Sequence, residues 1–180
     1  MEKIDIPVSE SHRIINAGSV ILITATTANL STITTVAWHM PVSGSPKLLG
    51  LSLGFERFSL KIIEESKSFC INLPELSMLN EVIYCGTHSG RDVDKLAKTG
   101  LTSSKCKIID AYYIEECVGH IECLVYKMYD SGDHKVVIGK VIASYVNKNL
   151  FNDNGVIDIS RVKLIHHLGG SQFGILSPND

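Results

Sequence analysis

The sequence predicts a mainly β fold, a β-barrel with helical insertions, and three observations lead to that prediction. Short runs rich in β-branched and apolar residues recur along the 180 residues, and Gly or Pro bounds several of them. Helical spacing is confined to brief stretches between these runs. No internal repeat, low-complexity segment or linker interrupts the chain, so a single domain over residues 1–180 is expected. Many strands with few connecting helices are typical of a barrel.

The first half of the chain is expected to combine strands with short helices. Ser59 suits the N-cap of a helix over residues 59–65, because its hydroxyl can accept a hydrogen bond from a first-turn amide. Asp92 and Asp94 fall in the first turn of a helix expected over 92–98, where the helix dipole favours carboxylates. A third helix is predicted at 77–84. Strands are predicted at 19–25, 32–38, 48–53 and 67–73, the first two joined by a turn at 27–30.

The second half is expected to be almost entirely strand. Two long extended runs, 119–129 and 135–147, are predicted to form a hairpin through residues 130–134. Polar residues alternate with apolar ones in the first of these runs, which indicates one wet and one dry face. Shorter strands are predicted at 112–114, 156–159 and 162–168.

Composition and charge exclude several kinds of partner. The formal net charge is −2, with 17 basic and 19 acidic residues, so no global field attracts nucleic acid. The first residues lack the basic and apolar regions of a signal peptide, and no apolar run approaches the roughly 20 residues that cross a bilayer. We therefore expect a cytoplasmic protein that contacts neither nucleic acid nor membrane.

No metal site is expected. None of the five cysteines forms a Cys-x-x-Cys pair, and free thiols fit a reducing compartment. Cys85 precedes a small-residue segment, but a buried packing role suits it better than a reactive one. His166 and His167 are adjacent in a predicted strand, so their imidazoles point to opposite faces and cannot easily share one ion.

Three short motifs carry chemistry. The hydroxyl run that includes Thr32, Thr34 and Thr35 lies just before Ala37 and the only tryptophan, Trp38. Hydroxyls can hold an oxyanion and an indole can cover a ring, so this stretch suits a ligand that is flat and phosphorylated. A turn at Ser89-Gly90 leads to cations at Arg91 and Lys95, and Gly132-Asp133-His134 places an imidazole in a tight turn.

Each motif taken alone also has a structural interpretation. Threonine-rich segments are common in strands, and Trp38 by itself would suit the core. Arg57 and Lys95 by themselves would be solvated surface charges, and Ser89-Gly90 a simple turn. His134 by itself would be a solvent-facing residue of a hairpin loop.

The order of these motifs resembles that of the flavin reductase-like, FMN-binding split-barrel family, which includes flavoredoxins and ferric-reductase-like proteins. The resemblance runs from about residue 15 to about residue 170. Its pieces are Thr35-Val36-Ala37-Trp38, Pro46 with the 48–53 strand, Arg57-Phe58-Ser59, Phe69 to Pro74, Ser89-Gly90 through Lys95, Ile121-Glu122-Cys123, Gly132-Asp133-His134 and Ile138 to Val141.

The resemblance implies a homodimer that binds FMN and, in many members, reduces flavin with NADH or NADPH. It implies that Thr32, Thr34, Thr35, Arg57, Ser59 and Lys95 hold the FMN phosphate, with charge-assisted bonds from the two cations. Trp38, Ser52 and Leu53 would lie against the isoalloxazine, with Ala37, Ser89 and Gly90 completing the cofactor site. His134 would help position the nicotinamide, and no Gly-x-Gly-x-x-Gly fingerprint offers a separate dinucleotide fold for it.

The function expected from the resemblance is an NAD(P)H:FMN oxidoreductase. An alternative is an FMN-bearing electron-transfer protein that docks with a redox partner and does not use NAD(P)H directly. A third possibility is a non-redox flavin-binding module on the same scaffold. Residues 41–46 and 85–90 are expected to shape the approach of the second substrate, whether a protein partner or a small acceptor.

Overall fold

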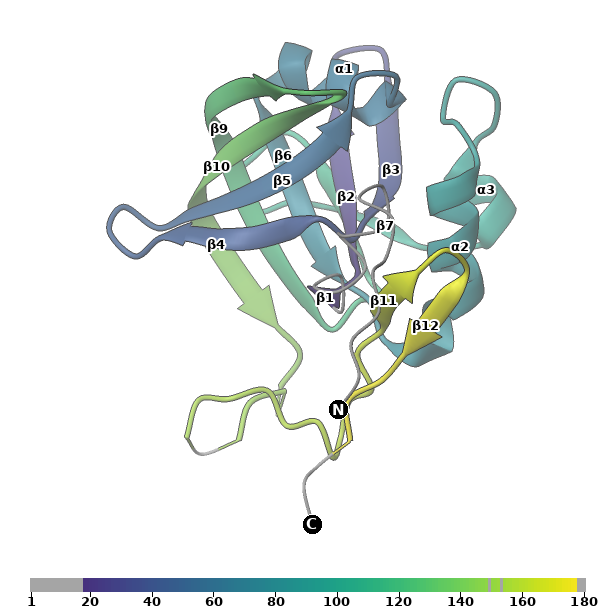
Figure 1. Cartoon of the computed structure of the whole chain (residues 1–180), viewed down its shortest axis with the longest axis vertical. Helices are drawn as coiled ribbons and strands as arrows, with labels where there is room; N and C mark the ends of the chain where they lie inside the picture. The colour runs from purple at the N-terminus through teal and green to yellow at the C-terminus, as the bar shows by residue number, and fades with distance from the viewer. Residues whose placement is uncertain (1–17, 149, 153, 178–180) are drawn as a thin grey trace, which may run out of the picture.

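The computed structural model describes residues 18–148, 150–152 and 154–177 of the chain. Its body is a seven-stranded antiparallel sheet that curls into a barrel (Figure 1). The strands are β2 (Ile21–Thr26), β3 (Ser31–Val36), β4 (His39–Ser43), β5 (Leu48–Gly54), β6 (Ser68–Leu73), β9 (Gly119–Ser131) and β10 (His134–Val146). Their order is β3-β2-β6-β9-β10-β5-β4, so β3 and β4 are the two edges of the sheet.

Two small sheets and three α-helices surround the barrel. One sheet joins β1 (Gly18–Ser19), β11 (His166–Gly169) and β12 (Gln172–Gly174), and the other pairs β7 (Ser103–Lys105) with β8 (Tyr112–Ile114). The helices are α1 (Phe58–Ser66), α2 (Leu79–Thr87), which follows a 3₁₀ turn at Leu76–Met78, and α3 (Lys95–Thr99). Figure 1 shows α2 and α3 on the β3 side of the barrel, with the β11–β12 hairpin beside α2.

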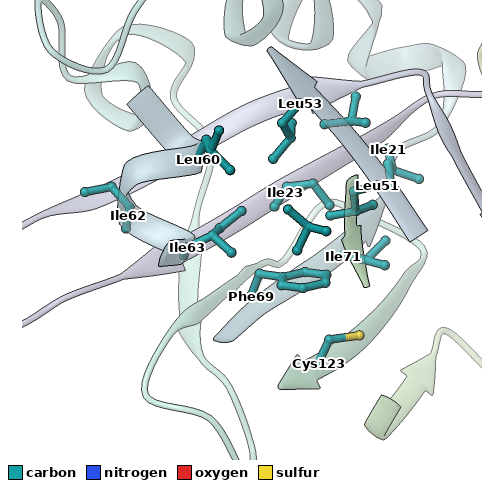
Figure 2. Close-up of a cluster of buried hydrophobic side chains, with 13 residues drawn as sticks. Ile21, Ile23, Leu51, Leu53, Leu60, Ile62, Ile63, Phe69, Ile71 and Cys123 are labelled. Atoms are coloured by element: carbon teal, nitrogen blue, oxygen red, sulfur yellow. The ribbon is translucent and has the colours of Figure 1, made fainter. Parts of the chain in front are cut away.

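The barrel interior is an apolar core closed by α1. Figure 2 shows Leu60 and Ile63 of α1 directed toward Ile23 of β2 and Phe69 of β6, all four almost completely buried. Alternate residues of β2 point the other way, and Leu22 packs in a second apolar cluster with Val82 of α2. Because β2 is covered on both faces, its first three residues are all apolar instead of alternating with polar ones.

The mainly β fold is confirmed, and so are six of the seven strands of the large sheet, with β4 as the exception. The predicted runs at 19–25, 32–38, 48–53 and 67–73 correspond to β2, β3, β5 and β6, and the turn at 27–30 is closed by a bond from the Thr27 amide to the Leu30 carbonyl of 2.7 Å. The long hairpin is β9–β10, and Gly132 in its turn has a φ of 62°. That left-handed conformation is one that glycine adopts without a Cβ penalty.

Two helix starts differ from the prediction. Arg57, not Ser59, occupies the N-cap of α1, and no side chain caps its first amides. Ser59 lies inside the first turn with its hydroxyl buried. α3 begins at Lys95 rather than at 92, because the Asp94 carboxylate accepts from the Ala97 amide at 3.1 Å and residues 92–93 form a turn on the Ser89 carbonyl.

The strand predictions were wrong at several places. Residues 39–43, for which no strand was predicted, form the edge strand β4, a position where a proline without an amide hydrogen is tolerated. Residues 156–159 contribute only an isolated bridge from Ile157, and the predicted strand at 162–168 begins at His166. The short strands β7 and β12 were missed.

Glu122, part of one family-like motif, has a structural role. Its carboxylate is fully buried and accepts hydrogen bonds from the amides of Lys107, Ile108 and Ile109 at 2.7, 2.8 and 3.0 Å. Burial raises the pKa of Glu122, but these amide bonds outweigh it and the pKa is lowered overall. The carboxylate therefore fixes the loop after β7.

Candidate functional site

Two adjoining cavities gather every site residue that the sequence predicted. The large cavity has a volume of about 530 Å³ and the small cavity about 250 Å³, and both are lined by Arg57 and Thr87. Of the predicted residues, Thr35, Ala37, Trp38, Ser52, Leu53 and His134 line the large cavity, and Thr32, Thr34, Ser59, Ser89, Gly90 and Lys95 line the small one. The structure thus brings together segments that are far apart in the sequence.

The alternation of strand β3 divides its threonines between the two cavities. Thr32 and Thr34 are buried and face the small cavity, whereas Thr35 points to the opposite face of the strand. The Thr35 hydroxyl donates to the Val82 carbonyl of α2 at 2.5 Å, and the residue lines the large cavity. The structure therefore places Thr35 away from the group of residues predicted to hold a phosphate.

The small cavity holds a buried hydroxyl that has no hydrogen-bond partner within the described residues. Ser59 is 2% exposed, and its Oγ is among the buried polar atoms without a partner. A buried polar group without a partner carries an energetic cost of about 1–3 kcal/mol. Because Ser59 lines the small cavity, a ligand oxygen bound there could accept its hydrogen bond.

A buried ammonium group lines the same cavity. Lys95 is 5% exposed, and its Nζ donates to the carbonyl oxygens of Cys85 at 2.7 Å and Ile33 at 2.9 Å. An ammonium has three protons, so one more bond can be made. Burial lowers the pKa of Lys95, and the positive charge of Arg57 lowers it further, while Cys85 acts in the opposite direction. An anion bound in the small cavity would stabilise the charged form of Lys95 and so oppose the effect of burial.

Arg57 stands at the boundary between the cavities. Its Nη1 donates to the Gly86 carbonyl of α2 at 2.9 Å, and its side chain is 46% exposed, with Glu56 Oε1 3.7 Å from its Nε. It also occupies the N-cap of α1, so the partial positive charge of that helix end lies beside its backbone. The guanidinium and the helix start therefore add positive potential to the small cavity.

The large cavity has more aromatic side chains in its lining than the small one. Trp38 is 43% exposed, and its ring lies 5.0 Å from that of His134, centroid to centroid, at an interplanar angle of 31°. His134 Nδ1 is 2.6 Å from Asp133 Oδ1, and this hydrogen bond lowers the pKa of the Asp133 carboxyl. The carboxylate thus orients the imidazole at the cavity wall.

The residues that form two walls of the large cavity were not predicted as site residues. Val82, Ile83, Gly86 and Thr87 of α2 form one, and His167, Gly169, Gly170, Ser171 and Phe173 of the β11–β12 hairpin form the other. The glycine pair after His166-His167 was the available signal for the hairpin. A side chain at position 86 would crowd Thr35, because a Cβ there would lie 3.2 Å from the Thr35 Cβ.

The segment 41–46 does not reach either cavity. Pro41 lines a separate apolar groove between β4, β5 and the far ends of β6, β9 and β10. The expected part of 41–46 in the approach of a second substrate is therefore not supported by its position, whereas Gly86, Thr87, His88, Ser89 and Gly90 do line the cavities.

Within the described residues, no group of three or more His, Cys, Asp or Glu side chains is placed to hold a metal ion. All five cysteines are buried free thiols, and burial raises the pKa of Cys85 to about 11. In the same part of the chain, no helix is long and apolar enough to span a membrane.

Comparison with known proteins identifies the family. The chain belongs to the flavin reductase like domain family, whose model matches residues 13–170. An uncharacterized protein of Archaeoglobus fulgidus is 32% identical over 139 residues, which cover 77% of this chain and 77% of that protein.

Two solved structures confirm the predicted split-barrel fold. A flavoredoxin from Methanosarcina acetivorans has a TM-score of 0.84 at 23% identity, over 100% of this chain and 94% of that chain. An FMN-binding protein from Thermus thermophilus, with bound 1-cyclohex-2-enone, has a TM-score of 0.84 at 18% identity, over 99% of each chain.

Proposed function

We propose that this protein is an FMN-binding oxidoreductase that reduces flavin, or another acceptor, with NAD(P)H. The observation that carries the proposal is the pairing of the two cavities. A polar cavity with a partnerless hydroxyl and a buried ammonium adjoins an aromatic cavity about twice its volume. FMN has the same two parts, a dianionic phosphate and a flat ring, and the similar Thermus thermophilus protein is an FMN-binding protein.

The small cavity fits a phosphate monoester. Ser59 would donate to one phosphate oxygen, and the third Lys95 proton to another, so both groups would gain the partner that burial denies them. Arg57 would contribute a charge-assisted bond from the boundary. Thr32 and Thr34 would add hydroxyl donors from β3.

The large cavity fits an isoalloxazine ring. Trp38 and Leu53 would contact the ring, and the α2 and β11–β12 walls would confine it. FMN would supply hydride acceptance at its ring, so the protein need supply no acid for the transfer. His134 would position the nicotinamide of NAD(P)H by hydrogen bonding, held by Asp133.

Anaerobic spectroscopy tests this proposal. The purified full chain, reconstituted with FMN, should show flavin absorption bands that bleach when NADH or NADPH is added. If the bands bleach only with dithionite or a reduced partner protein, the protein is an electron carrier and not an NAD(P)H-dependent enzyme. A chain that binds no FMN would overturn both.

We also propose that the protein is a homodimer. The apolar groove beside β4 has a volume of about 670 Å³, and Met40 on its rim is 58% exposed. Exposed apolar surface of this kind favours association. Light scattering after size exclusion should give twice the chain mass, and Met40→Glu should shift the protein toward monomer. A wild-type monomer at high concentration would contradict the proposal.

A further inference from the structure

His88 lines the small cavity at the end of helix α2, and the proposed function gives it no part. Its imidazole stacks on the ring of Tyr84, one turn earlier in the helix, with 3.9 Å between the ring centroids and an interplanar angle of 15°. The side chain is exposed at the cavity. The stack therefore fixes the plane of a ring that a ligand in the cavity can reach.

Hydrogen bonds at Nδ1 assign the position of the imidazole proton. His88 Nδ1 lies 3.2 Å from the Tyr84 carbonyl oxygen and 3.1 Å from Thr87 Oγ1. A carbonyl can only accept, and the Thr87 hydroxyl uses its own proton for the Ile83 carbonyl at 2.8 Å, so it also accepts from Nδ1. The proton of the neutral ring is therefore on Nδ1, and Nε2 carries a lone pair.

A phosphate in the small cavity would favour a second proton on this ring. Phosphate oxygens accept hydrogen bonds, so the lone pair of a neutral Nε2 offers them no bond. With a proton on Nε2 the ring becomes a cation and makes a charge-assisted bond to the phosphate. The bonds at Nδ1 stay as they are in this step.

The charges around the cavity act in the same sense. Among the described residues, the charged side chains that line the small cavity are three cations and one carboxylate: Arg57, Arg91, Lys95 and Glu56. Their net positive charge disfavours an imidazolium in the flavin-free protein. A phosphate monoester carries about −1.5 to −2 at neutral pH and nearly cancels that charge.

The end of helix α2 also favours a positive ring. His88 is the C-cap of this nine-residue helix, and its amide donates to the Tyr84 carbonyl at 3.1 Å. The C-terminal end of a helix carries a partial negative charge, which stabilises a cation placed beside it. Tyr84 is the titratable neighbour of His88 on α2 itself.

We propose that His88 is a ligand of the flavin phosphate and that FMN binding places a proton from solvent on its Nε2. This inference rests on the proposed flavin function and adds a proton-linked residue to the same site. The proton returns to solvent when FMN leaves. A histidine imidazole ordinarily titrates close to neutral pH, so binding and protonation are coupled in the range where the protein would work.

Isothermal titration calorimetry of the full chain, freed of flavin by dialysis, tests this inference. FMN is titrated at pH 7.5 in two phosphate-free buffers that differ in ionisation enthalpy, which gives the number of protons taken up. Wild type should take up about half a proton more per FMN than His88→Gln, whose amide can donate at any pH. Between pH 7 and pH 9, the FMN affinity of wild type should fall about tenfold more than that of the variant.

Two controls isolate the phosphate and the residue. Riboflavin lacks the phosphate, so its binding should involve the same number of protons in wild type and His88→Gln. His39 lines the separate apolar groove and neither flavin cavity, and its Nε2 lies 2.7 Å from the Ser19 carbonyl oxygen. His39→Gln can keep that hydrogen bond through its amide and should retain the full proton uptake on FMN binding.

The outcomes separate this inference from the proposed function. Equal proton uptake by wild type and His88→Gln on FMN binding would overturn the inference and leave the proposed function intact. Extra uptake that also appears with riboflavin, or that His39→Gln abolishes, would overturn it as well, because the proton would then not depend on His88 and the phosphate. A wild-type chain that binds no FMN would overturn the proposed function itself.

Discussion

The small and large cavities differ in how their walls are held. The polar groups of the small cavity come from strand β3, the start of helix α1 and the segment 89–95. They are buried, since Thr34, Ser59 and Lys95 are 3%, 2% and 5% exposed. The large cavity is lined by partly exposed rings, with Trp38 at 43%. Buried, preorganised donors give affinity, whereas an open aromatic wall admits a second molecule. In the proposed function, the small cavity retains the flavin and the large cavity gives a second reactant access to it.

The largest effect is expected at Lys95. Lys95→Met should weaken FMN binding about 100-fold, which corresponds to about 2.7 kcal/mol, because it removes a charged donor from a buried site. The affinity for riboflavin, which lacks the phosphate, should change little. Lys98, exposed on the same helix, provides the matched control Lys98→Met, which should leave both affinities unchanged. Equal losses for both ligands would contradict a phosphate role.

Both the stability of the protein and its affinity for FMN should depend on pH through Lys95. Burial lowers the pKa of Lys95 in the folded protein below its ordinary value of 10.5. At a pH between the lowered pKa and 10.5, Lys95 is therefore protonated in the unfolded chain and deprotonated in the folded one. The free energy of unfolding of the flavin-free protein should therefore rise with pH in that window, while FMN affinity falls as the ammonium is neutralised. Titrations of wild type against Lys95→Met isolate this contribution, and identical pH profiles for the two would contradict it.

A smaller effect is expected at Arg57, since its side chain is about half exposed and solvent weakens its charge. Arg57→Ala should weaken FMN binding about tenfold. Arg161→Ala removes an exposed arginine paired with Asp158 and should have no effect on affinity. Fluorescence quenching measures both, and unchanged FMN affinity in Arg57→Ala would remove this residue from the site.

Ser59 separates affinity from stability. Ser59→Ala should weaken FMN binding about fivefold, the effect of about 1 kcal/mol for one neutral hydrogen bond. The flavin-free protein should lose no stability, because the deleted hydroxyl has no partner in the described residues. Ser66, in the same helix, donates to the Ser68 carbonyl at 3.0 Å, so Ser66→Ala should lower the free energy of unfolding. Urea denaturation of both variants checks this contrast.

The smallest effect concerns the large cavity. His134→Ala should raise the KM for NAD(P)H about threefold, the effect of losing about 0.6 kcal/mol of hydrogen bonding, and leave FMN affinity unchanged. Steady-state kinetics and fluorescence quenching on one preparation distinguish the two. A variant that loses FMN but keeps its KM would mean that His134 belongs to the flavin site instead.

The strands that were predictable are those buried on both faces or alternating between wet and dry faces. β2 begins with three consecutive apolar residues because Leu22 packs in the cluster that contains Val82 of α2, while Ile21 and Ile23 face the barrel core. β4 has the opposite character, with Met40 and Val42 exposed and Pro41 in its middle, so no periodic pattern marks it. Edge strands of this kind are set by their neighbour, here β5, rather than by their own residues.

The site was predictable where family-like motifs supplied its groups, and not where a cavity wall depends on tertiary packing alone. The family-like motifs led to Arg57 and Lys95, although a lysine alone would be assigned to the surface. Strand alternation alone predicts that Thr32 and Thr34 point to one face of β3 and Thr35 to the other. Which face meets Val82 depends on how β3 packs against α2, which the sequence does not specify. The wall from Gly169 to Phe173 depends on the pairing of β11 with β1, which local sequence does not specify.

A comparison of FMN with riboflavin tests the central claim most directly. The claim is that the small cavity binds the phosphate and the large cavity binds the ring. Quenching titrations of the flavin-free wild-type chain should show FMN binding at least about 100-fold more tightly than riboflavin, since a buried charged donor and several polar donors depend on the phosphate. Equal affinity for the two flavins would contradict the assignment of the small cavity.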